Sequence, residues 1–163
     1  MIKLKKLTLK HINKTYLKWM NDKMVFKYTD QYKTNHTLRQ IKKYVKDRLK
    51  SNEIIFGIFY KNVHIGNIKL GPIDYLNKTS EISYFIGEKQ YWGMGIGALA
   101  IKNLINIAKK KGLKKLIAGC VQQNKSSQRV LKKNKFKIEG RLKSQYIINK
   151  SRTTNLIYGL IVK

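Results

Sequence analysis

Residues 81–112, EISYFIGEKQYWGMGIGALAIKNLINIAKKKG, constrain the fold of this chain more than any other segment. Residues 82–86 predict a strand, and the apolar residues that recur through 96–108 cover one wide face of a predicted helix. Three lysines followed by Gly112 predict the end of that helix. The turn between strand and helix carries three glycines, Gly93, Gly95 and Gly97. The segment therefore predicts a strand, a glycine turn and a helix N-terminus in succession.

This arrangement is typical of an anion-binding site. A helix N-terminus presents free N–H groups and the positive end of the helix dipole, which suit phosphate oxygens. Glycines let the backbone approach a bulky diphosphate, because no Cβ intervenes. Neither common phosphate loop matches, since there is no G-x-x-x-x-G-K-[ST] and no acidic residue about 20 positions on. Close packing of a helix on a sheet is the structural alternative for the same glycines.

The charge of the chain favours anionic ligands. The 163 residues include 36 Lys and Arg against 8 Asp and Glu, a formal net charge of +28. The basic residues are spread along the chain and form no isolated tail. We therefore expect a positive field that concentrates polyanionic ligands. With one proline and 42% hydrophobic residues, the composition predicts a single globular domain over 1–163.

Several kinds of protein are disfavoured by the composition. No apolar run reaches about 18 residues, and the N-terminus lacks the apolar block of a signal peptide. The single Cys120 has no disulfide partner, so the sequence predicts a cytoplasmic protein without membrane association. The histidines, His11, His36 and His64, and the cysteine show no metal-ligand spacing, so no metal site is predicted. Cys120 is expected to be a buried strand residue.

Hydrophobic periodicity predicts the remaining elements. The predicted strands are 2–9, 54–60, 63–70, 82–86, 116–121, 136–142 and 155–162, and the predicted helices are 12–20, 38–49, 96–111 and 125–134. Turns are expected at Lys61–Asn62 and Asn149–Lys150, and Gly71–Pro72 is expected to interrupt the strand pattern. The order β-α-α-β-β-β-α-β-α-β-β predicts a mixed α/β (α+β) fold, a central mixed sheet of about seven strands flanked by about four helices.

Two sequence blocks carry a family resemblance. The first is Gln90-x-x-Gly93-x-Gly95, which resembles the acetyl-CoA signature of the GNAT superfamily of N-acetyltransferases. The second is Asn124-x-x-Ser127, then Val130-Leu131, then Asn134-x-Phe136-x-x-Glu139-Gly140. It is similar to a block in the branch that acetylates the N-termini of ribosomal proteins. The sequence departs from that branch at Lys135, where Gly usually precedes Phe, and at Tyr146, where some members place a glutamate base.

The first third of the chain resembles relatives that acetylate nucleotide-linked amino sugars. The resemblance rests on Tyr16-Leu17-x-Trp19-x-Asn21-Asp22 followed by Tyr28 and Tyr32. It implies substrate-binding roles for Trp19, Tyr28 and Tyr32. Aromatic residues that cover a core are the structural alternative for the same positions.

The family resemblance implies a cofactor site for acetyl-CoA as co-substrate. Backbone N–H groups in the glycine segment would hold the pyrophosphate, at Gln90, Gly93, Met94, Gly95, Ile96 and Gly97. The pantetheine arm would run between the strands 81–86 and 116–121, as an added strand does. Asn124 would hydrogen-bond the arm, or serve as a helix N-cap, or both. A backbone N–H near Phe85 or Ile86 would polarise the thioester carbonyl.

Three side chains are candidates for catalysis. Glu81 begins the strand nearest the thioester and is the predicted base, directly or through water; an exposed carboxylate neutralised by a lysine is its alternative. Ser127 would bind or protonate the departing sulfur, with a solvated first-turn serine as its alternative. Tyr146 would orient the acceptor or relay a proton, with packing on the sheet as its alternative.

Three function hypotheses follow. The preferred one is an acetyl-CoA-dependent N-acetyltransferase whose acceptor is a small, anionic primary amine, foremost a nucleotide-linked amino sugar. The second is an acetyltransferase of protein N-terminal α-amines. The third, of another class, is a basic nucleic-acid-binding module on a degenerate acetyltransferase fold, which the intact glycine turn disfavours. The sequence is compatible with a monomer or a homodimer.

Overall fold

The computed structural model describes the backbone from Met1 to Lys163 and every side chain except those of Asp30 and Tyr32. Over that backbone the chain forms seven strands and four α-helices, as the sequence predicted. The strands are β1 (Ile2–Lys6), β2 (Ile54–Tyr60), β3 (Val63–Asp74), β4 (Thr79–Ile86), β5 (Lys115–Val121), β6 (Lys137–Ile148) and β7 (Ser151–Ile161). The α-helices are α1 (Lys14–Met20), α2 (Leu38–Leu49), α3 (Ile96–Lys110) and α4 (Lys125–Lys133). Three 3-10 helices are η1 (Leu9–His11), η2 (Asp30–Lys33) and η3 (Lys89–Tyr91).

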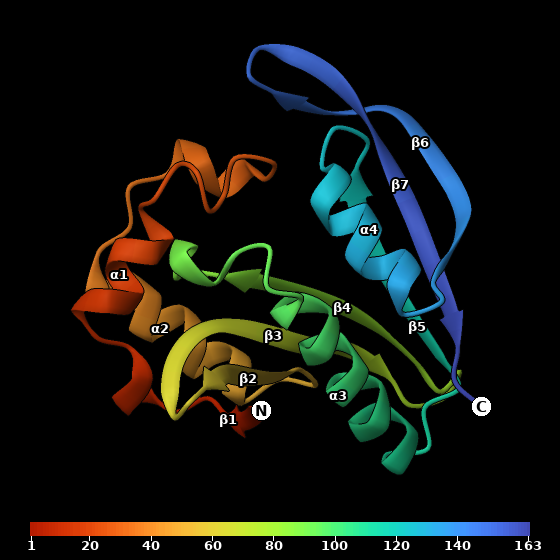
Figure 1. Cartoon of the computed structure of the whole chain (residues 1–163), viewed down its shortest axis with the longest axis horizontal. Coiled ribbons are helices and arrows are strands. Elements are labelled where there is room, and N and C mark those ends of the chain that lie inside the picture. Colours follow the sequence, from red (N-terminus) through yellow and green to blue (C-terminus); the bar gives the residue numbers. More distant parts are fainter.

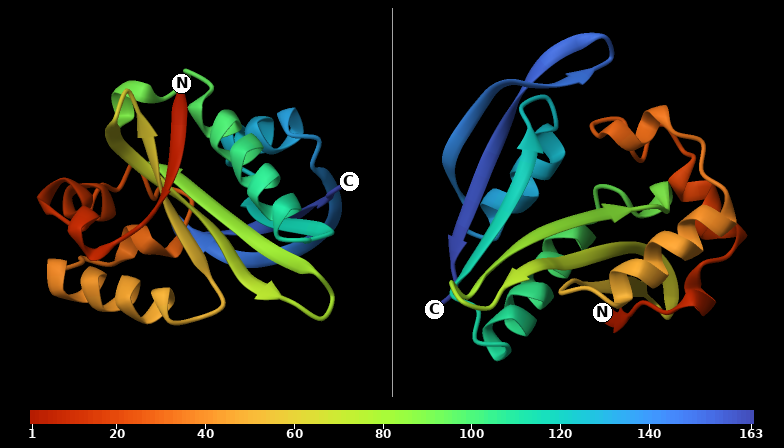
Figure 2. Two further views of the ribbon diagram at one scale, coloured as in Figure 1. Left: turned by 90° about the horizontal axis from the view of Figure 1, so that it is seen from below. Right: turned by 180° about the vertical axis from the view of Figure 1, so that it is seen from behind.

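All seven strands form one sheet in the order β1-β2-β3-β4-β5-β7-β6. Every neighbouring pair is antiparallel except β4 and β5, which run parallel. The parallel ladder is short, because it pairs only residues 79–81 with residues 115–117. Beyond these residues β4 and β5 diverge, and the sheet opens into a V (Figure 1; Figure 2, right). The V leaves one edge of each strand facing the opening.

Helices cover both faces of the sheet (Figure 2, left). The apolar face of α3, from Ile96 to Ala108, packs into the main core with residues of β2 to β5 and β7. On the opposite face, α1 and α2 build a second cluster around Tyr16, Trp19 and Val45. The period of the apolar residues in each helix accounts for these buried faces.

Side chains cap three of the α-helices. Asn13 accepts a hydrogen bond from the backbone N–H of Tyr16 at the start of α1 (3.1 Å), and Asn124 accepts one from the N–H of Ser127 in α4 (3.1 Å). Thr37 caps α2 in a capping box with Gln40. The exception is α3, whose N-cap is a glycine without a side chain. The first N–H groups of α3 therefore lack the side-chain acceptor that the other helices have.

Apart from shifts of up to three residues at the ends of other elements, the structure differs from the predicted elements in three places. β3 continues through Gly71–Pro72 to Asp74, because the proline sits at a bulge between Leu70 and Ile73, where the ladder with β4 shifts register. Leu9, predicted to lie in the first strand, begins η1 instead. β6 and β7 are longer than predicted and form an extended hairpin that turns at residues 149–150. Most of β6 is exposed on both faces, so the period-2 apolar signal is missing there.

Candidate functional site

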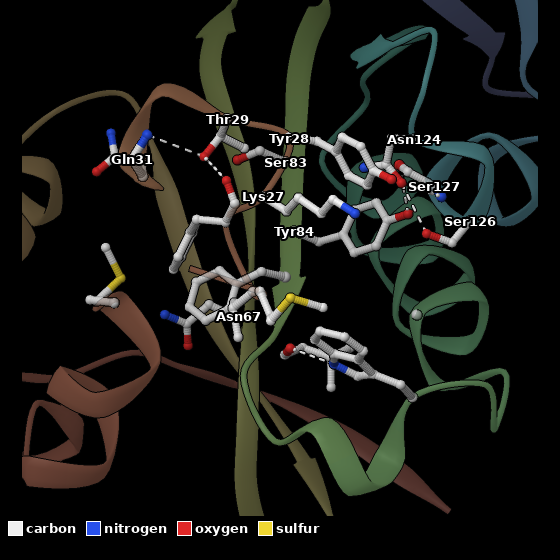
Figure 3. Close-up of a pocket in the computed structure, with 18 of the residues that line it drawn as sticks. Lys27, Tyr28, Thr29, Gln31, Asn67, Ser83, Tyr84, Asn124, Ser126 and Ser127 are labelled. Carbon is white, nitrogen blue, oxygen red and sulfur yellow. Dashed lines mark hydrogen bonds between the residues drawn. The ribbon is translucent and has the colours of Figure 1, made fainter. Parts of the chain in front are cut away.

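A cavity of about 1100 Å³ lies in the opening of the V. Its floor comes from β3 and β4, and segments 91–97 and 124–130 form one wall, which we call the turn side. The other wall, which we call the α2 side, comes from residues between 16 and 44. Figure 3 shows the side chains of both walls pointing toward one another over β4. A volume of this size exceeds that of most pockets for one small ligand and accommodates two.

The glycine turn forms one end of the turn side. Gly93 and Gly95 have φ angles of 77° and 74°, in the left-handed region that favours glycine. A Cβ added at either position would meet no protein atom within 4 Å. The turn therefore has free space in front of its backbone, next to the uncapped N-terminus of α3. This is the geometry that binds phosphate oxygens at a helix start.

Gly97, in the first turn of α3, has a different role. A Cβ at this position would lie 3.4 Å from the Tyr84 ring and 3.8 Å from Val130 of α4. The glycine thus lets α3 pack closely against β4 and α4. Close packing, the structural alternative for the glycine segment, accounts for Gly97 but not for Gly93 or Gly95.

A hydrogen-bonded group joins β4 to α4 across the turn side (Figure 3). The hydroxyl of Tyr84 lies 3.0 Å from that of Ser127, whose backbone N–H donates to the Asn124 side chain. Burial raises the pKa of Tyr84 to about 12, so its hydroxyl stays protonated at neutral pH. The Tyr84 hydroxyl can therefore donate to Ser127 while Ser127 donates to a bound ligand.

The α2 side combines apolar and basic side chains. Met20, Phe26 and Tyr44 line it, together with Tyr28, whose ring lies 5.4 Å from the amine of Lys27. Figure 3 shows the Lys27 side chain extending toward Tyr84. Two further basic residues line the cavity, Lys69 on the floor and Arg129 on the turn side. No Asp or Glu lines the cavity among the side chains that the structure describes. A cationic ligand would find no counter-charge on these walls.

The structure brings many of the predicted site residues to this cavity. Those that line it are Tyr28, Phe85, Ile86, Gly93, Gly95, Ile96, Gly97, Asn124 and Ser127. Gln90, in η3, and Met94 are exposed near the turn and are not among the lining residues. The side chain of Tyr32 lies outside the described part of the chain.

Three other predicted residues lie away from the cavity. Glu81 is exposed and borders a separate, smaller hollow beside Pro72 and Ile117, at the closed end of the V. Tyr146 stands on the exposed hairpin strand β6, with 36% of its surface accessible. Trp19 is 3% exposed and donates a hydrogen bond to Glu88 (2.9 Å). Aromatic residues that cover a core were the structural alternative for Trp19, and the structure places this residue in the core.

The cavity also contains residues that the sequence did not single out. Tyr84 was hidden because its strand neighbours Ile82 and Ile86 indicate only a buried face. Trp92 donates a hydrogen bond to the carbonyl of Ile86 (2.9 Å) and lines the cavity. Lys69 could not be distinguished from the many other lysines of the chain. Only the pairing of β3 with β4 places it inside the V.

The Cys120 thiol and the possible metal ligands among the described residues are not arranged for nucleophilic catalysis or metal binding. Cys120 is 5% exposed, and burial raises the pKa of its thiol, which keeps it protonated. The cysteine is a buried strand residue, as predicted. Within the described residues no group of three or more His, Cys, Asp or Glu is placed to hold a metal ion. None of the helices described is both long and apolar enough to cross a membrane.

Comparisons with known proteins agree with this geometry. The sequence profile described as "Acetyltransferase (GNAT) domain" matches residues 2–137. Ribosomal-protein-serine acetyltransferase from Escherichia coli (strain K12) is 33% identical over 109 residues, which cover 66% of this chain and 60% of the relative. The matched region thus spans less than two thirds of that relative's length.

Solved structures share the fold over nearly the whole chain. One is RimL, described as a ribosomal L7/L12 alpha-N-protein acetyltransferase in complex with coenzyme A. It has a TM-score of 0.90 at 20% identity, with 99% of this chain and 94% of that chain covered. Spermidine N-acetyltransferase from Vibrio cholerae, in complex with CoA and spermine, has a TM-score of 0.88 at 16% identity, with 99% and 95% covered.

The chain therefore shares its fold with acetyltransferases that were solved in complex with coenzyme A. The chain belongs to the GNAT acetyltransferase family. The family and the fold class inferred from the sequence are confirmed.

Proposed function

We propose that the protein is an acetyl-CoA-dependent N-acetyltransferase of one domain, in which a primary amine attacks the thioester directly in a ternary complex. The observation that carries this proposal is the cavity that runs from the open glycine turn, past Tyr84 and Ser127, to a wall without described carboxylates. One end of this cavity suits the diphosphate of acetyl-CoA, and the other end suits the amine that accepts the acetyl group.

The residues present fit acetyl-CoA. The space in front of Gly93 and Gly95, which a Cβ would fill, suits the pyrophosphate, with the N–H groups at the start of α3 as donors. The free edges of β4 and β5 beyond their short ladder suit the pantetheine arm. Asn124 caps α4 from the cavity wall and could also contact that arm. Acetyl-CoA would supply the activated acetyl group.

The protein groups near the divergence of β4 and β5 have defined tasks in this proposal. A backbone N–H near Phe85 or Ile86 donates to the thioester carbonyl. Ser127 donates a hydrogen bond to the departing sulfur, and Tyr84 orients the Ser127 hydroxyl. Ser127, Asn124 and Tyr84 thus form one network on the cofactor side of the cavity.

The cavity has no described carboxylate that could act as a base, and this limits how basic the acceptor amine can be. Glu81 borders a different hollow, so its proposed role as base requires a water molecule between it and the amine. A lysine-like amine with a pKa near 10.4 is neutral in under roughly one molecule in a thousand at pH 7. An α-amine with a pKa near 8 is neutral in roughly one in ten, and a less basic sugar amine in more. A cavity without a described base therefore favours the less basic amines.

The basic residues that line the cavity indicate the charge of the acceptor. Lys27, Lys69 and Arg129 line the cavity, and the chain carries a net charge of +28. A polyamine such as spermine would face these cations without a described carboxylate partner, whereas an anionic acceptor would be attracted. We therefore propose a small anionic amine as acceptor, foremost a nucleotide-linked amino sugar.

A second candidate is the α-amine of a protein N-terminus. The 33% identity to a ribosomal-protein-serine acetyltransferase supports it, and an α-amine meets the same requirement for low basicity. An acidic target protein would also suit the charge of this chain. The two candidates differ in whether the acceptor is a small molecule or a polypeptide.

The test is a thiol-release assay with acetyl-CoA and a panel of acceptors. The panel contains amino-sugar nucleotides, peptides with free N-termini and polyamines. We expect turnover with the amino-sugar nucleotides and little with the polyamines. Turnover with peptides alone would replace the preferred acceptor by the second candidate. Failure of acetyl-CoA to raise the melting temperature, when an oligonucleotide of equal charge does so, would contradict the enzyme proposal.

A further inference from the structure

We infer that Lys69 is the anion-binding group for the acceptor, and that the acceptor carries a carboxylate or phosphate close to its reactive amine. This inference rests on the proposed function and names a recognition residue within it. Lys69 is a residue of β3 that pairs with Ser83 of β4 on one side and with Ile55 of β2 on the other. Directly paired residues point to the same face, so Lys69 and Ser83 rise side by side from the cavity floor.

A buried carboxylate fixes the ammonium group of Lys69. Its Nζ lies 3.0 Å from Oε1 of Glu53, whose side chain is 4% exposed. The guanidinium of Arg48 lies 3.4 Å from the same oxygen. Two cations thus share one carboxylate, and the cluster retains one positive charge. Lys27 also lines the cavity, but no ion pair holds it among the described residues, so Lys69 is the better-positioned cation.

The geometry leaves donors for a ligand. An ammonium group has three N–H donors, and a single hydrogen bond, to Glu53, occupies Lys69 within the described part of the chain. Its side chain remains 22% exposed and belongs to the cavity lining. A carboxylate or phosphate oxygen on the acceptor can therefore complete the coordination of Lys69. Since no described Asp or Glu lines the cavity, the acceptor itself is the source of that anion.

The position of Lys69 sets the size of the acceptor. Lys69 pairs with Ser83 of β4. Ser83 lies two residues before Phe85, where the thioester carbonyl is proposed to bind. A strand rises about 3.3 Å per residue, so these positions are about 7 Å apart. An acceptor that reaches both has its acidic group roughly four to six bonds from its amine at this spacing. Amino sugars that carry a phosphate on the carbon next to the amine belong to this class, whereas polyamines, which have no acidic group, do not.

Isothermal titration calorimetry on the protein saturated with CoA tests the inference, with glucosamine 1-phosphate and glucosamine as probes. We expect the wild-type protein to bind the phosphorylated sugar at least about tenfold more tightly, since a hydrogen-bonded ion pair is at stake. The double variant Lys69→Met with Glu53→Gln removes the cation without leaving a buried carboxylate unpaired, and should lose this preference. Ser83→Asp, which neutralises Lys69 from the neighbouring strand, should lose it as well.

Lys102→Met is the matched control, because Lys102 is an exposed lysine of α3 outside the cavity. It should keep the wild-type preference. Equal affinity of the wild-type protein for the two sugars would overturn the inference, as would a preference that survives in both Lys69-directed variants. CoA affinity, measured first, separates the two proposals. If CoA does not bind, the proposed function fails; if CoA binds but the sugars are not distinguished, only this inference fails.

Discussion

The hydroxyl of Tyr84 lies 3.0 Å from the hydroxyl of Ser127, and this contact connects β4 to α4 across the mouth of the V. The two residues are 43 positions apart in the chain. The Tyr84 ring also packs against Gly97 in the first turn of α3. One aromatic side chain therefore sets the relation between the strand, the helix that begins at the glycine turn and the serine proposed to contact sulfur.

Ser127→Ala should lower kcat by about 10- to 100-fold, because it removes a hydrogen bond to a developing thiolate. Tyr84→Phe should cause a smaller decrease, since the Ser127 hydroxyl remains but is no longer oriented. Combining the two changes should cost little beyond Ser127→Ala alone. Steady-state kinetics with saturating acetyl-CoA measures all three. Ser151→Ala, at an exposed serine outside the cavity, is the control. Fully additive effects of Tyr84→Phe and Ser127→Ala would contradict the orienting role of Tyr84.

Gly95→Val should weaken the affinity for CoA by at least about tenfold, because a branched side chain would occupy the space proposed for the pyrophosphate. The substitution also strains the backbone at a φ of 74°, at a cost of roughly 1–3 kcal/mol. Gly112→Val is a matched control at the other end of α3. Its φ is 76°, and its Cβ likewise meets no atom within 4 Å. Calorimetric titration with CoA should separate the variants, and equal affinities would count against the assignment of the turn.

Gly87→Ala should destabilise the fold whatever the protein acts on. A Cβ at this position would overlap the indole of Trp19, which is held by its hydrogen bond to Glu88. Overpacking of this kind costs roughly 1–3 kcal/mol, which is about 2–12 °C in melting temperature for a chain of this length. Gly140→Ala is the control, because its Cβ would make an ordinary contact of 3.7 Å with Ile157. Equal melting temperatures for the two variants would show that Trp19 is not fixed in the core.

The stability of the protein should decrease as the pH falls below about 6.5, owing to His64. Burial lowers the pKa of His64 below its ordinary value of 6.5, and the nearby His11 lowers it further. The unfolded chain therefore takes up a proton on His64 at a higher pH than the folded protein does. Stability from this residue is fully present above pH 6.5 and is lost as the pH falls through the folded-state pKa.

Urea denaturation at a series of pH values between 8 and 5 measures this effect. His64→Gln should flatten the pH dependence of the unfolding free energy in that range. The pKa values of Asp22, Asp47 and Asp74 are lowered from 3.8, mainly by their hydrogen bonds, so their contributions are lost only at more acidic pH. A pH dependence that is the same with and without His64 would contradict the prediction.

The sequence by itself determined the order of the elements and one end of the site. The glycines at 93 and 95, the periodic apolar face of α3 and the Asn124–Ser127 block are local signals, and each acts through its own stretch of backbone. A turn with positive φ angles and an amphipathic helix need no distant partner to be recognised. These signals predicted the family correctly, as well as the fold class.

The tertiary structure alone decided the other end of the site. Glu81 lies away from the cavity because β4 and β5 still pair at that point, and Lys69 lies in it because of the pairing of β3 with β4. Neither pairing has a signature within a single strand. Trp19 and Tyr28 have similar aromatic surroundings in the sequence, but packing buries the first and leaves the second on the cavity wall. The acceptor side is built from contacts between distant segments. Its charge and shape therefore emerge only when the sheet has opened into its V.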